Sequence, residues 1–543
     1  MDPVDTARRA VPDRHLRAPL AGPVPRRFLI GAALVWLAMT PALLLFYATI
    51  TPNPDQALFD YIGWISWQGG SYYADAFEIN WPAVFLVHEL GQRLFGAVPW
   101  AFRVFDYLVL LGVCAGVAWF LVQAGLARAA VLFALIYPPL YVTAGGWMSG
   151  QRDIMVGGLA FIALALALPR GRGDGIALVA AGAMLGLIVL IRPTWLALLA
   201  LLLVAEVIGA ARPSIRRGPA VAALAGGAVA VIAGAVGLGA ASGTLRDWWE
   251  QAVLFVILDY RGTSPRLELL GTLSEVFLSW WHWPVALGLA GVVLWGASWS
   301  RIDAISRRAL LLTLGVLGVV LLSYGVMNKG FQYHLGGALP VFVVWMCVLL
   351  DRTWSAAEGG HPRRMTAARG LLAGCAVLIV AGLGSKFAGF SPRSVDGHTI
   401  GAQGIDAGVA LPLNQDARMA LVDWIRAETD PQDRIFQWGW NYQIVQLAER
   451  LPSTRFITTP VIAGLNPRMP FHDDWVEEAA ADFANHPPAV ALLERAAVRT
   501  HTLPLETHAN APILLQLYVD RLNAGDYDIA FTFDDLLVLR HRP

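Results

Sequence analysis

Long apolar runs, separated by short polar segments, fill the chain from residue 28 to residue 385. A helix needs about 20 consecutive apolar residues to cross the hydrocarbon core of a bilayer. The runs therefore predict a mainly α-helical, polytopic membrane protein with about eleven transmembrane helices. The predicted spans are 28–50, 104–123, 126–144, 153–168, 175–191, 193–211, 219–240, 283–299, 309–326, 336–351 and 368–385.

The segment 51–103, between the first two predicted spans, is too long for a simple turn and has a helical pattern of its own. Apolar residues from Leu58 to Ile65 recur at helical spacing. A second helix is expected to begin at Pro82, because proline suits the first helical turn. We predict that both helices lie in the membrane interface, with Trp64 among the anchors, because amphipathic helices that carry tryptophan bind there.

Beyond residue 390 charged residues return and the apolar runs become short. Alternating strand and helix patterns there predict a small α/β domain. The expected domains are a basic tail over 1–27, a membrane domain over 28–389 and the α/β domain over 390–543. Within the last, we expect helices over 416–428 and 442–450 and strands over 433–439, 455–458, 490–493, 529–533 and 536–540.

Arginines are concentrated in the N-terminal tail and in every second loop after it. Because cytoplasmic loops carry the excess of Lys and Arg, this alternation predicts a cytoplasmic N-terminus. It also predicts that the segment 51–103, the turn 327–335 and the C-terminal domain lie on the opposite, outer side.

The composition supports a lipid environment and excludes some partners. Only 15% of the residues are charged and 56% are hydrophobic, with a mean hydropathy of +0.54. Soluble domains carry about 25% charged residues, so the lipid bilayer is an expected partner. The 40 basic and 40 acidic residues balance, and no global positive field exists that would attract nucleic acid. The three cysteines lie in apolar spans without metal-ligand spacing.

Ionisable residues gather on the predicted outer side. Charged groups near a membrane core are energetically costly, so each of them is a candidate for a functional role. A carboxylate there could take the proton of an attacking hydroxyl. Arginine, lysine or histidine could neutralise a departing phosphate, and arginine does so with two-point geometry. The candidates are Asp55, Asp60, Asp75, Glu78, Arg152, Asp153, Arg192, Lys329, Tyr333 and His334.

Structural roles stay open for most of these residues. Lys329 is the strongest candidate for phosphate binding, because it is one of two lysines in the chain and lies in a short outer turn. No histidine partner at ligand spacing supports a metal site at His334. The structural alternatives are a helix N-cap for Asp55, an ion pair or solvation for Asp60, loop capping for Asp75 and Glu78, a local ion pair for Arg152 with Asp153, and snorkelling for Arg192.

The order of short motifs resembles the GT-C membrane glycosyltransferases of the family-39-like type, which include protein O-mannosyltransferases and lipid A aminoarabinose and galacturonic acid transferases. The likeness covers most of the chain, and it is the order of the motifs that makes it specific. The motifs are Asp55-Gln56, Gly69-Gly70, Tyr73-x-Asp75, Asn80-x-Pro82, Leu94-Phe95-Gly96, Ala101-x-Arg103, Arg192-Pro193-Thr194, Tyr333-His334 with Pro340, Gln437-Trp438-Gly439 and Leu451 to Phe456.

The resemblance implies an inverting transfer of a sugar from a polyprenyl-phosphate donor, with the first-loop aspartate as the catalytic carboxylate. Asp55 matches that position, and Asp153 lies where many members carry a second outer acid. The chain departs from the family pattern at Gln56, where a glutamate is common. This puts in question whether a second acid beside Asp55 is needed.

These observations together predict a bacterial inner-membrane glycosyltransferase with Asp55 as general base and a glycan, lipid or protein as acceptor. No cofactor is expected, although a divalent cation stays open. The alternatives are a transporter or flippase of lipid-linked sugars, a polysaccharide polymerase or ligase, and a non-enzymatic assembly protein. A transporter would favour internal repeats and charges near mid-membrane, whereas the acids here cluster at one face.

Overall fold

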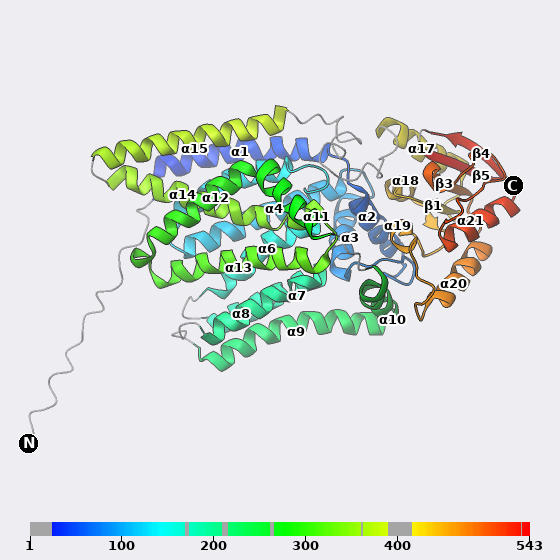
Figure 1. Ribbon diagram of the computed structural model, residues 1–543, viewed down its shortest axis with the longest axis horizontal. Helices are drawn as coiled ribbons and strands as arrows, with labels where there is room; N and C mark the ends of the chain where they lie inside the picture. The colour runs from blue at the N-terminus through cyan, green and yellow to red at the C-terminus, as the bar shows by residue number, and fades with distance from the viewer. Residues whose placement is uncertain are drawn as a thin grey trace, which may run out of the picture.

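The computed structural model describes residues 24–168, 173–208, 215–260, 265–359, 362–388, 415–533 and 535–542. Most of the predicted basic tail and the expected boundary near residue 390 lie outside these residues. Helices dominate the described chain, and a single sheet lies near the C-terminus (Figure 1).

Every predicted membrane span coincides with a helix, so the polytopic α-helical architecture is confirmed. Among the described residues, seven helices are long and apolar enough to cross a membrane, and a bent pair ending in α12 would make eight. α5 and α8 are apolar but shorter. The bundle helices are α1 (Arg26–Ala48), α4 (Ala101–Gln123), α5 (Ala127–Val142), α6 (Arg152–Ala167), α7 (Asp174–Ile191), α8 (Leu196–Ile208), α9 (Arg217–Ala241), α12 (His282–Ala297), α13 (Ala304–Met327), α14 (Ala338–Gly359) and α15 (Pro362–Ala388).

Within the described residues, some of the segments that were predicted to be cytoplasmic contact one another. Arg128 at the start of α5 forms an ion pair of 2.7 Å with Glu358 at the end of α14. Ser306 at the start of α13 donates a hydrogen bond of 2.7 Å to the carbonyl of Ala124 at the end of α4. The alternation of basic loops thus corresponds to two distinct ends of one bundle.

The segment between the first two spans forms the two predicted helices, α2 (Pro54–Trp67) and α3 (Pro82–Phe95). Leu86, Leu90 and Leu94 form an exposed apolar stripe on α3, as expected of an interfacial helix. Helix α2 is instead buried over most of its length, so its apolar side chains pack within the protein. Trp64 is buried and stacks on Tyr61 rather than anchoring in the interface.

Further short helices cap the same end of the bundle. They are α10 (Leu245–Trp249), which continues with π-helical turns to Tyr260, and α11 (Arg266–Ser274), which continues to Trp280. In Figure 1, α10 lies between the end of α9 and α20 of the C-terminal domain.

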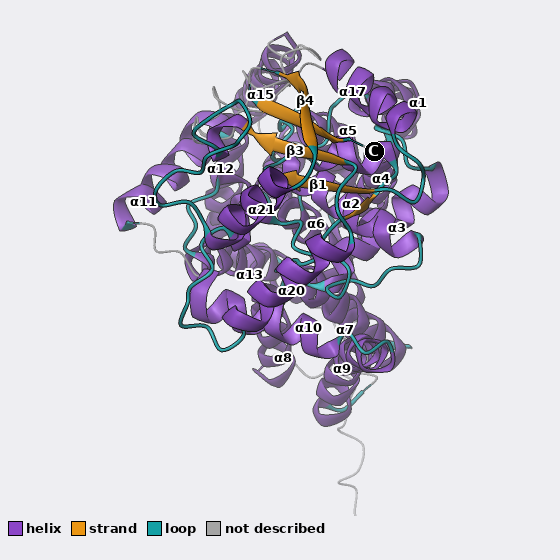
Figure 2. Cartoon of the chain, turned by 90° about the vertical axis from the view of Figure 1, so that its right-hand side faces the viewer, coloured by secondary structure: helices purple, strands orange, loops and turns teal. Residues whose placement is uncertain are grey.

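The C-terminal domain has a five-stranded mixed sheet in the order β2-β1-β3-β5-β4. β1 (Arg434–Trp438) pairs in parallel with β2 (Leu451–Pro452) and β3 (Val490–Glu494), while β5 (Leu536–His541) is antiparallel to β3 and to β4 (Tyr527–Thr532). Figure 2 looks onto this end and shows β1, β3 and β4 in front of the membrane helices. The helices of the domain are α17 (Gln415–Glu428), α18 (Tyr442–Ala448), α19 (Thr459–Ile462), α20 (His472–Asn485) and α21 (Ile513–Ala524).

The α/β character of this domain is confirmed, but the predicted strand over 455–458 is wrong. That segment packs on the first outer loop instead of joining the sheet. The backbone N–H of Phe77 donates to the carbonyl of Arg455 at 2.7 Å, and the Thr458 hydroxyl donates to the carbonyl of Phe77 at 2.5 Å. Backbone groups used in this way are not available for a sheet ladder.

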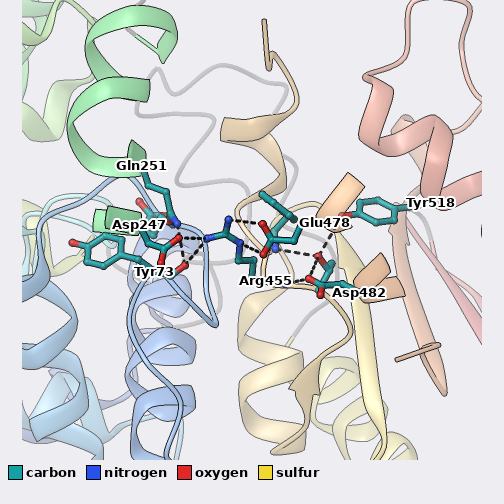
Figure 3. Close-up of polar contacts among 10 residues, drawn as sticks. Tyr73, Asp247, Gln251, Arg455, Glu478, Asp482 and Tyr518 are labelled. Carbon is teal, nitrogen blue, oxygen red and sulfur yellow. Dashed lines mark hydrogen bonds and ion pairs between the residues drawn. The ribbon is translucent and has the colours of Figure 1, made fainter. Parts of the chain in front are cut away.

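Arg455 joins the domain to the membrane part (Figure 3). Its Nη1 donates to the Tyr73 carbonyl at 3.1 Å and to Asp247 Oδ1 at 2.9 Å, and its Nη2 donates to Glu478 Oε2 at 2.7 Å. Tyr73 belongs to the first outer loop and Asp247 to α10. One buried guanidinium therefore fixes the domain against two separate outer segments.

Candidate active site

The first turn of α2 is held by a capping box, which fixes the place of Asp55. Asn53 Oδ1 accepts a hydrogen bond from the backbone N–H of Gln56 at 2.9 Å, and Gln56 Oε1 accepts one from the N–H of Asn53 at 3.2 Å. Pro54 occupies the first helical position. Asn53 is therefore the N-cap, and the capping role that was left open for Asp55 is wrong.

Gln56 also ties α2 to the loop before α6. Its Nε2 donates to the carbonyl of Ser149 at 2.8 Å, and Asn53 Nδ2 donates to the carbonyl of Gly146 at 2.9 Å. A glutamate at position 56 could complete the capping box, but an ionised carboxylate has no N–H to give to Ser149. The departure from the family pattern thus has a structural role.

Arg103 on α4 also stabilises the contact between α2 and the loop before α6. From the sequence it was noted only as part of the motif Ala101-x-Arg103. Its Nε donates to the Ile50 carbonyl at 3.0 Å, and its Nη2 to the Thr51 carbonyl at 2.9 Å. Its Nη1 donates to the Ser149 carbonyl at 3.0 Å. The buried Arg103 side chain thus holds together the segment before α2 and the loop before α6, which lead to Asp55 and to Arg152.

This scaffold brings Asp55 beside the start of α6. Gln151 Nε2 donates to Asp55 Oδ2 at 3.4 Å, and Arg152 interacts electrostatically with both Asp55 and Asp153. Arg192, at the end of α7, donates from Nε to Asp153 Oδ1 at 2.9 Å. An aspartate and an arginine from separate loops therefore lie together next to Asp55.

The turn between α13 and α14 completes the cluster. Tyr333 stacks on Trp147, with ring centroids 6.0 Å apart, and interacts electrostatically with Asp55 and Arg152. Burial lowers the pKa of His334 well below its ordinary value, and the charges of Arg192 and Arg152 lower it further. The imidazole is therefore neutral at physiological pH.

Lys329 lies in the same turn. Its Nζ donates to the carbonyl of Tyr260 at 2.5 Å and lies 3.6 Å from the centroid of the Tyr260 ring. Burial lowers the pKa of the Lys329 ammonium, and burial raises the pKa of Tyr260 to about 12. Lys329 acts on His334 electrostatically, so its charge belongs to the cluster.

A close helix contact makes this arrangement possible. A Cβ atom at Gly157 on α6 would lie 2.4 Å from Cα of Gly337, just before α14. Real side chains do not approach backbone so closely, so position 157 requires glycine. The contact places the first turn of α6 directly against the turn that carries Tyr333 and His334.

Several buried polar atoms of the cluster make no hydrogen bond with any residue that the structure describes. Leaving a buried donor or acceptor unsatisfied costs about 1–3 kcal/mol, and native proteins contain few such groups. Their concentration here indicates a site that a polar ligand completes. The atoms are Arg152 Nε and Nη1, Asp153 Oδ2, Gln151 Oε1, His334 Nδ1 and Trp147 Nε1.

The remaining candidates lie around this cluster with partners of their own. Asp60 Oδ1 is 2.8 Å from His88 Nδ1, in the contact between α2 and α3. Asp75 Oδ2 accepts from the N–H of Ser71 at 2.6 Å, within a turn. Glu78 accepts from the Thr458 hydroxyl at 2.8 Å, and burial raises the pKa of its carboxyl. Of these three, Glu78 is electrostatically linked to Arg152.

The divalent cation that was left open gains no support from geometry. Within the described ranges, no group of three or more His, Cys, Asp or Glu side chains is placed to hold a metal ion.

Comparison with known proteins identifies the fold. No protein-family model and no curated protein sequence matches the chain. The crystal structure of ArnT from Cupriavidus metallidurans bound to undecaprenyl phosphate superposes with a TM-score of 0.58. The identity is 14%, over 94% of this chain and 98% of ArnT. The apo form of the same protein gives a TM-score of 0.56, with the same identity and coverage.

The chain has the GT-C fold. The predicted resemblance to membrane glycosyltransferases is thereby confirmed at the level of architecture, including the small α/β domain after the bundle. In this GT-C fold the first outer loop, the start of α6 and the turn before α14 meet at one end of the bundle, where the unpartnered polar atoms are found.

Proposed function

We propose that the protein is a glycosyltransferase that moves a sugar from a polyprenyl-phosphate donor to an acceptor hydroxyl. The main support is that Asp55 interacts electrostatically with Arg152, whose buried Nε and Nη1 atoms have no hydrogen-bond partner among the described residues. A cation with free N–H groups suits a phosphate, and an adjacent carboxylate suits a hydroxyl that must lose a proton. The fold shared with ArnT, which was crystallised with undecaprenyl phosphate, supports such a donor.

In this reaction Asp55 takes the proton of the acceptor hydroxyl while its oxygen attacks the anomeric carbon of the sugar. The bond between that carbon and the phosphate oxygen breaks, and the polyprenyl phosphate leaves with one more negative charge. Attack from the side opposite the phosphate inverts the configuration. Arg152 and Lys329 stabilise the leaving charge, because fixed cations in a site with little water act strongly on developing charge.

The other buried residues position these groups. Asp153 accepts from Arg192, which fixes the start of α6 and keeps Asp153 Oδ2 directed at the site. His334 is neutral and therefore offers one hydrogen-bond donor and one acceptor without adding charge. We assign Asp60 and Asp75 to the structure of the first outer loop, since each has a local partner.

We further propose that the site faces the periplasm of a bacterial inner membrane. Arg128, in one of the predicted basic loops, pairs with Glu358 at the end of α5 remote from the site, and loops rich in arginine tend to remain cytoplasmic. A lipid-linked donor also explains how sugar transfer proceeds on a side that nucleotide sugars do not reach.

Replacement of the proposed base tests this function. Asp55→Asn is expected to lower transfer of labelled sugar from undecaprenyl-phosphate donors into envelope material by about 10²–10⁴-fold, because the amide cannot accept the proton. Asp75→Asn is the matched control, since Asp75 belongs to the same outer segment but bonds to Ser71. Wild-type transfer by a folded Asp55→Asn variant would reject the assignment.

A further inference from the structure

Residues 245–260, which follow α9 and which we call the outer arm, end on a residue of the proposed phosphate site. The outer arm begins with α10 and continues as a π-helix over Glu250–Tyr260. π-Helical turns are rare and are frequently found at functional sites. The carbonyl of Tyr260 accepts from Lys329 Nζ at 2.5 Å, and the centroid of its ring lies 3.6 Å from the same nitrogen. Both ends of Tyr260, backbone and ring, therefore hold the Lys329 ammonium.

The C-terminal domain contacts the outer arm at its start, in its middle and near its end. Figure 3 shows the contact at the start, where the arginine that joins the domain to the membrane part reaches α10. The three contacts are an ion pair of 2.9 Å between Arg455 Nη1 and Asp247 Oδ1, packing of the Trp475 ring on the Phe255 ring with centroids 5.8 Å apart, and a hydrogen bond of 3.3 Å from the backbone N–H of Asn466 to Asp259 Oδ2.

A row of aromatic rings connects α20 of the domain to Lys329. Trp475 packs on Phe255, which is buried, and Phe255 stacks on Tyr260 with ring centroids 6.4 Å apart. The Tyr260 ring then faces the Lys329 ammonium. Because protein interiors are closely packed and hardly compressible, displacement of one ring shifts the next. The position of α20 thus bears on the position of the Tyr260 ring.

The first outer loop holds the start of the outer arm as well. Gln251 Nε2 donates to the Tyr73 carbonyl at 3.0 Å, and Gln251 Oε1 accepts from the N–H of Glu78 at 3.1 Å. Toward the end of the arm, Ile257 and Leu258 are exposed. Packing on this part of the arm comes from the side of the C-terminal domain. We therefore expect the end of the arm to depend on the domain more than its start does.

We propose that the C-terminal domain positions Lys329 for the donor phosphate, acting through the outer arm and Tyr260. This inference rests on the proposed function, in which Lys329 stabilises the charge of the leaving phosphate. A cation over an aromatic face is attracted by the ring quadrupole. An ammonium has three N–H groups, and the bond to the Tyr260 carbonyl uses one, so a phosphate can be bound by the others.

The benefit of such positioning is a smaller entropic cost of binding. Lysine has a long, flexible side chain, and ordering it on binding costs about 0.5–1.5 kcal/mol. Contacts with Tyr260 order Lys329 before the phosphate arrives. Arg455 and Trp475 are thus positioning residues, which act on the donor through Lys329 and do not touch it.

The chain has two lysines, Lys329 and Lys386, so NMR can observe Lys329 directly. We would convert both to ¹³C-dimethyl-lysine, which keeps its charge and one N–H, in the full-length protein in phosphatidylethanolamine–phosphatidylglycerol nanodiscs. The Lys329 methyl signal should be shifted upfield by the ring current of Tyr260. Lys329→Arg should remove this signal, and Tyr260→Leu should remove its shift.

Variants that loosen the outer arm from the domain should reduce this upfield shift. Arg455→Gln removes the ion pair at the start of the arm, and Asp259→Ala removes the hydrogen bond near its end, which keeps the test valid if Arg455→Gln fails to fold. Arg426→Gln is the matched control, because Arg426 pairs at 2.9 Å with Glu449 inside the C-terminal domain. This control should keep the wild-type shift.

Binding of undecaprenyl phosphate separates positioning from a general structural role. Arg455→Gln should weaken binding about fivefold, the size of effect found for residues that are coupled through contacts. In a Lys329→Gln background, Arg455→Gln should cause no further loss, because the residue through which it acts is gone. Equal losses in both backgrounds, or wild-type affinity in Lys329→Gln, would overturn the inference.

The inference and the proposed function fail separately. An unchanged Lys329 signal in folded Arg455→Gln and Asp259→Ala would overturn the inference, whatever the sugar-transfer assay gives. Loss of the upfield shift in these variants, together with full transfer by Asp55→Asn, would support the inference and reject the assigned base.

Discussion

Two buried arginine–aspartate groups lie near the end of the bundle that carries α2, and they differ in whether the protein satisfies their hydrogen bonds. Arg103 donates from all three nitrogen atoms, and the Asp106 oxygens accept from the hydroxyls of Tyr47 and Tyr141. Arg152 Nε and Nη1 and Asp153 Oδ2 are also buried, yet they bond to nothing within the described chain.

This difference separates structural charges from charges available to a ligand. A buried ion is costly unless its hydrogen bonds are satisfied. Arg103 meets that condition with the protein alone, and it holds the chain at Ile50 and Ser149. Arg152 does not, so the protein retains an unfavourable arrangement that an anionic ligand would relieve. Retention of such a group is expected at a functional site.

The largest expected effect concerns stability at Arg103. Arg103→Gln should lower the free energy of unfolding by about 3 kcal/mol, because it breaks a satisfied buried network. Thermal unfolding in detergent measures this. Arg152→Gln is the matched comparison and should not lower the unfolding temperature. Equal losses in the two variants would remove the distinction between the groups.

The next effect concerns ligand binding at Arg152. Arg152→Gln should weaken binding of undecaprenyl phosphate about tenfold or more, because a hydrogen bond to a charged group contributes about 1.5–3 kcal/mol. Titration of the lipid into the purified protein, followed by tryptophan fluorescence, gives the Kd. Wild-type affinity in this variant would show that the unpartnered guanidinium does not bind the phosphate.

A smaller effect is expected for the pH dependence of Lys329. Burial lowers the pKa of its ammonium, so the proton is lost at a lower pH than from an exposed lysine. Affinity for undecaprenyl phosphate should therefore fall as the pH rises through that lowered pKa. In Lys329→Arg the guanidinium stays charged, and the fall should disappear. If the affinity for undecaprenyl phosphate fell equally at high pH in the wild type and in Lys329→Arg, deprotonation of Lys329 would be excluded as the cause.

The membrane helices could be predicted because a long apolar run indicates a span without reference to any partner elsewhere in the chain. The C-terminal domain was less predictable, since its elements depend on partners elsewhere. Residues 455–458 have a strand-like pattern. In the structure, however, the Arg455 carbonyl and the Thr458 hydroxyl form hydrogen bonds with the backbone of Phe77, between α2 and α3. Helix α20 was not predicted because its apolar positions alternate with acidic ones such as Asp473, Asp474 and Glu477, and α21 was not predicted either.

Some residues of the candidate site could likewise be proposed from the sequence, and others could not. Asp55, Arg152 and Asp153 could be proposed from the sequence because charged residues at a membrane face are rare, and they remain candidates. The roles of Gln56 and Arg103 were missed because their partners lie far away in the chain, as with the bond from Gln56 to Ser149. The ion-pair alternative for Asp60 could not be given a partner from the sequence, because His88 lies on the next helix.

The most direct test is a cryo-electron microscopy structure of the protein with undecaprenyl phosphate. The account predicts that the phosphate lies within hydrogen-bonding distance of Arg152 Nε or Nη1, on the side that also faces Asp55 and Lys329. A phosphate bound elsewhere, with the Arg152 guanidinium still without a partner, would contradict it.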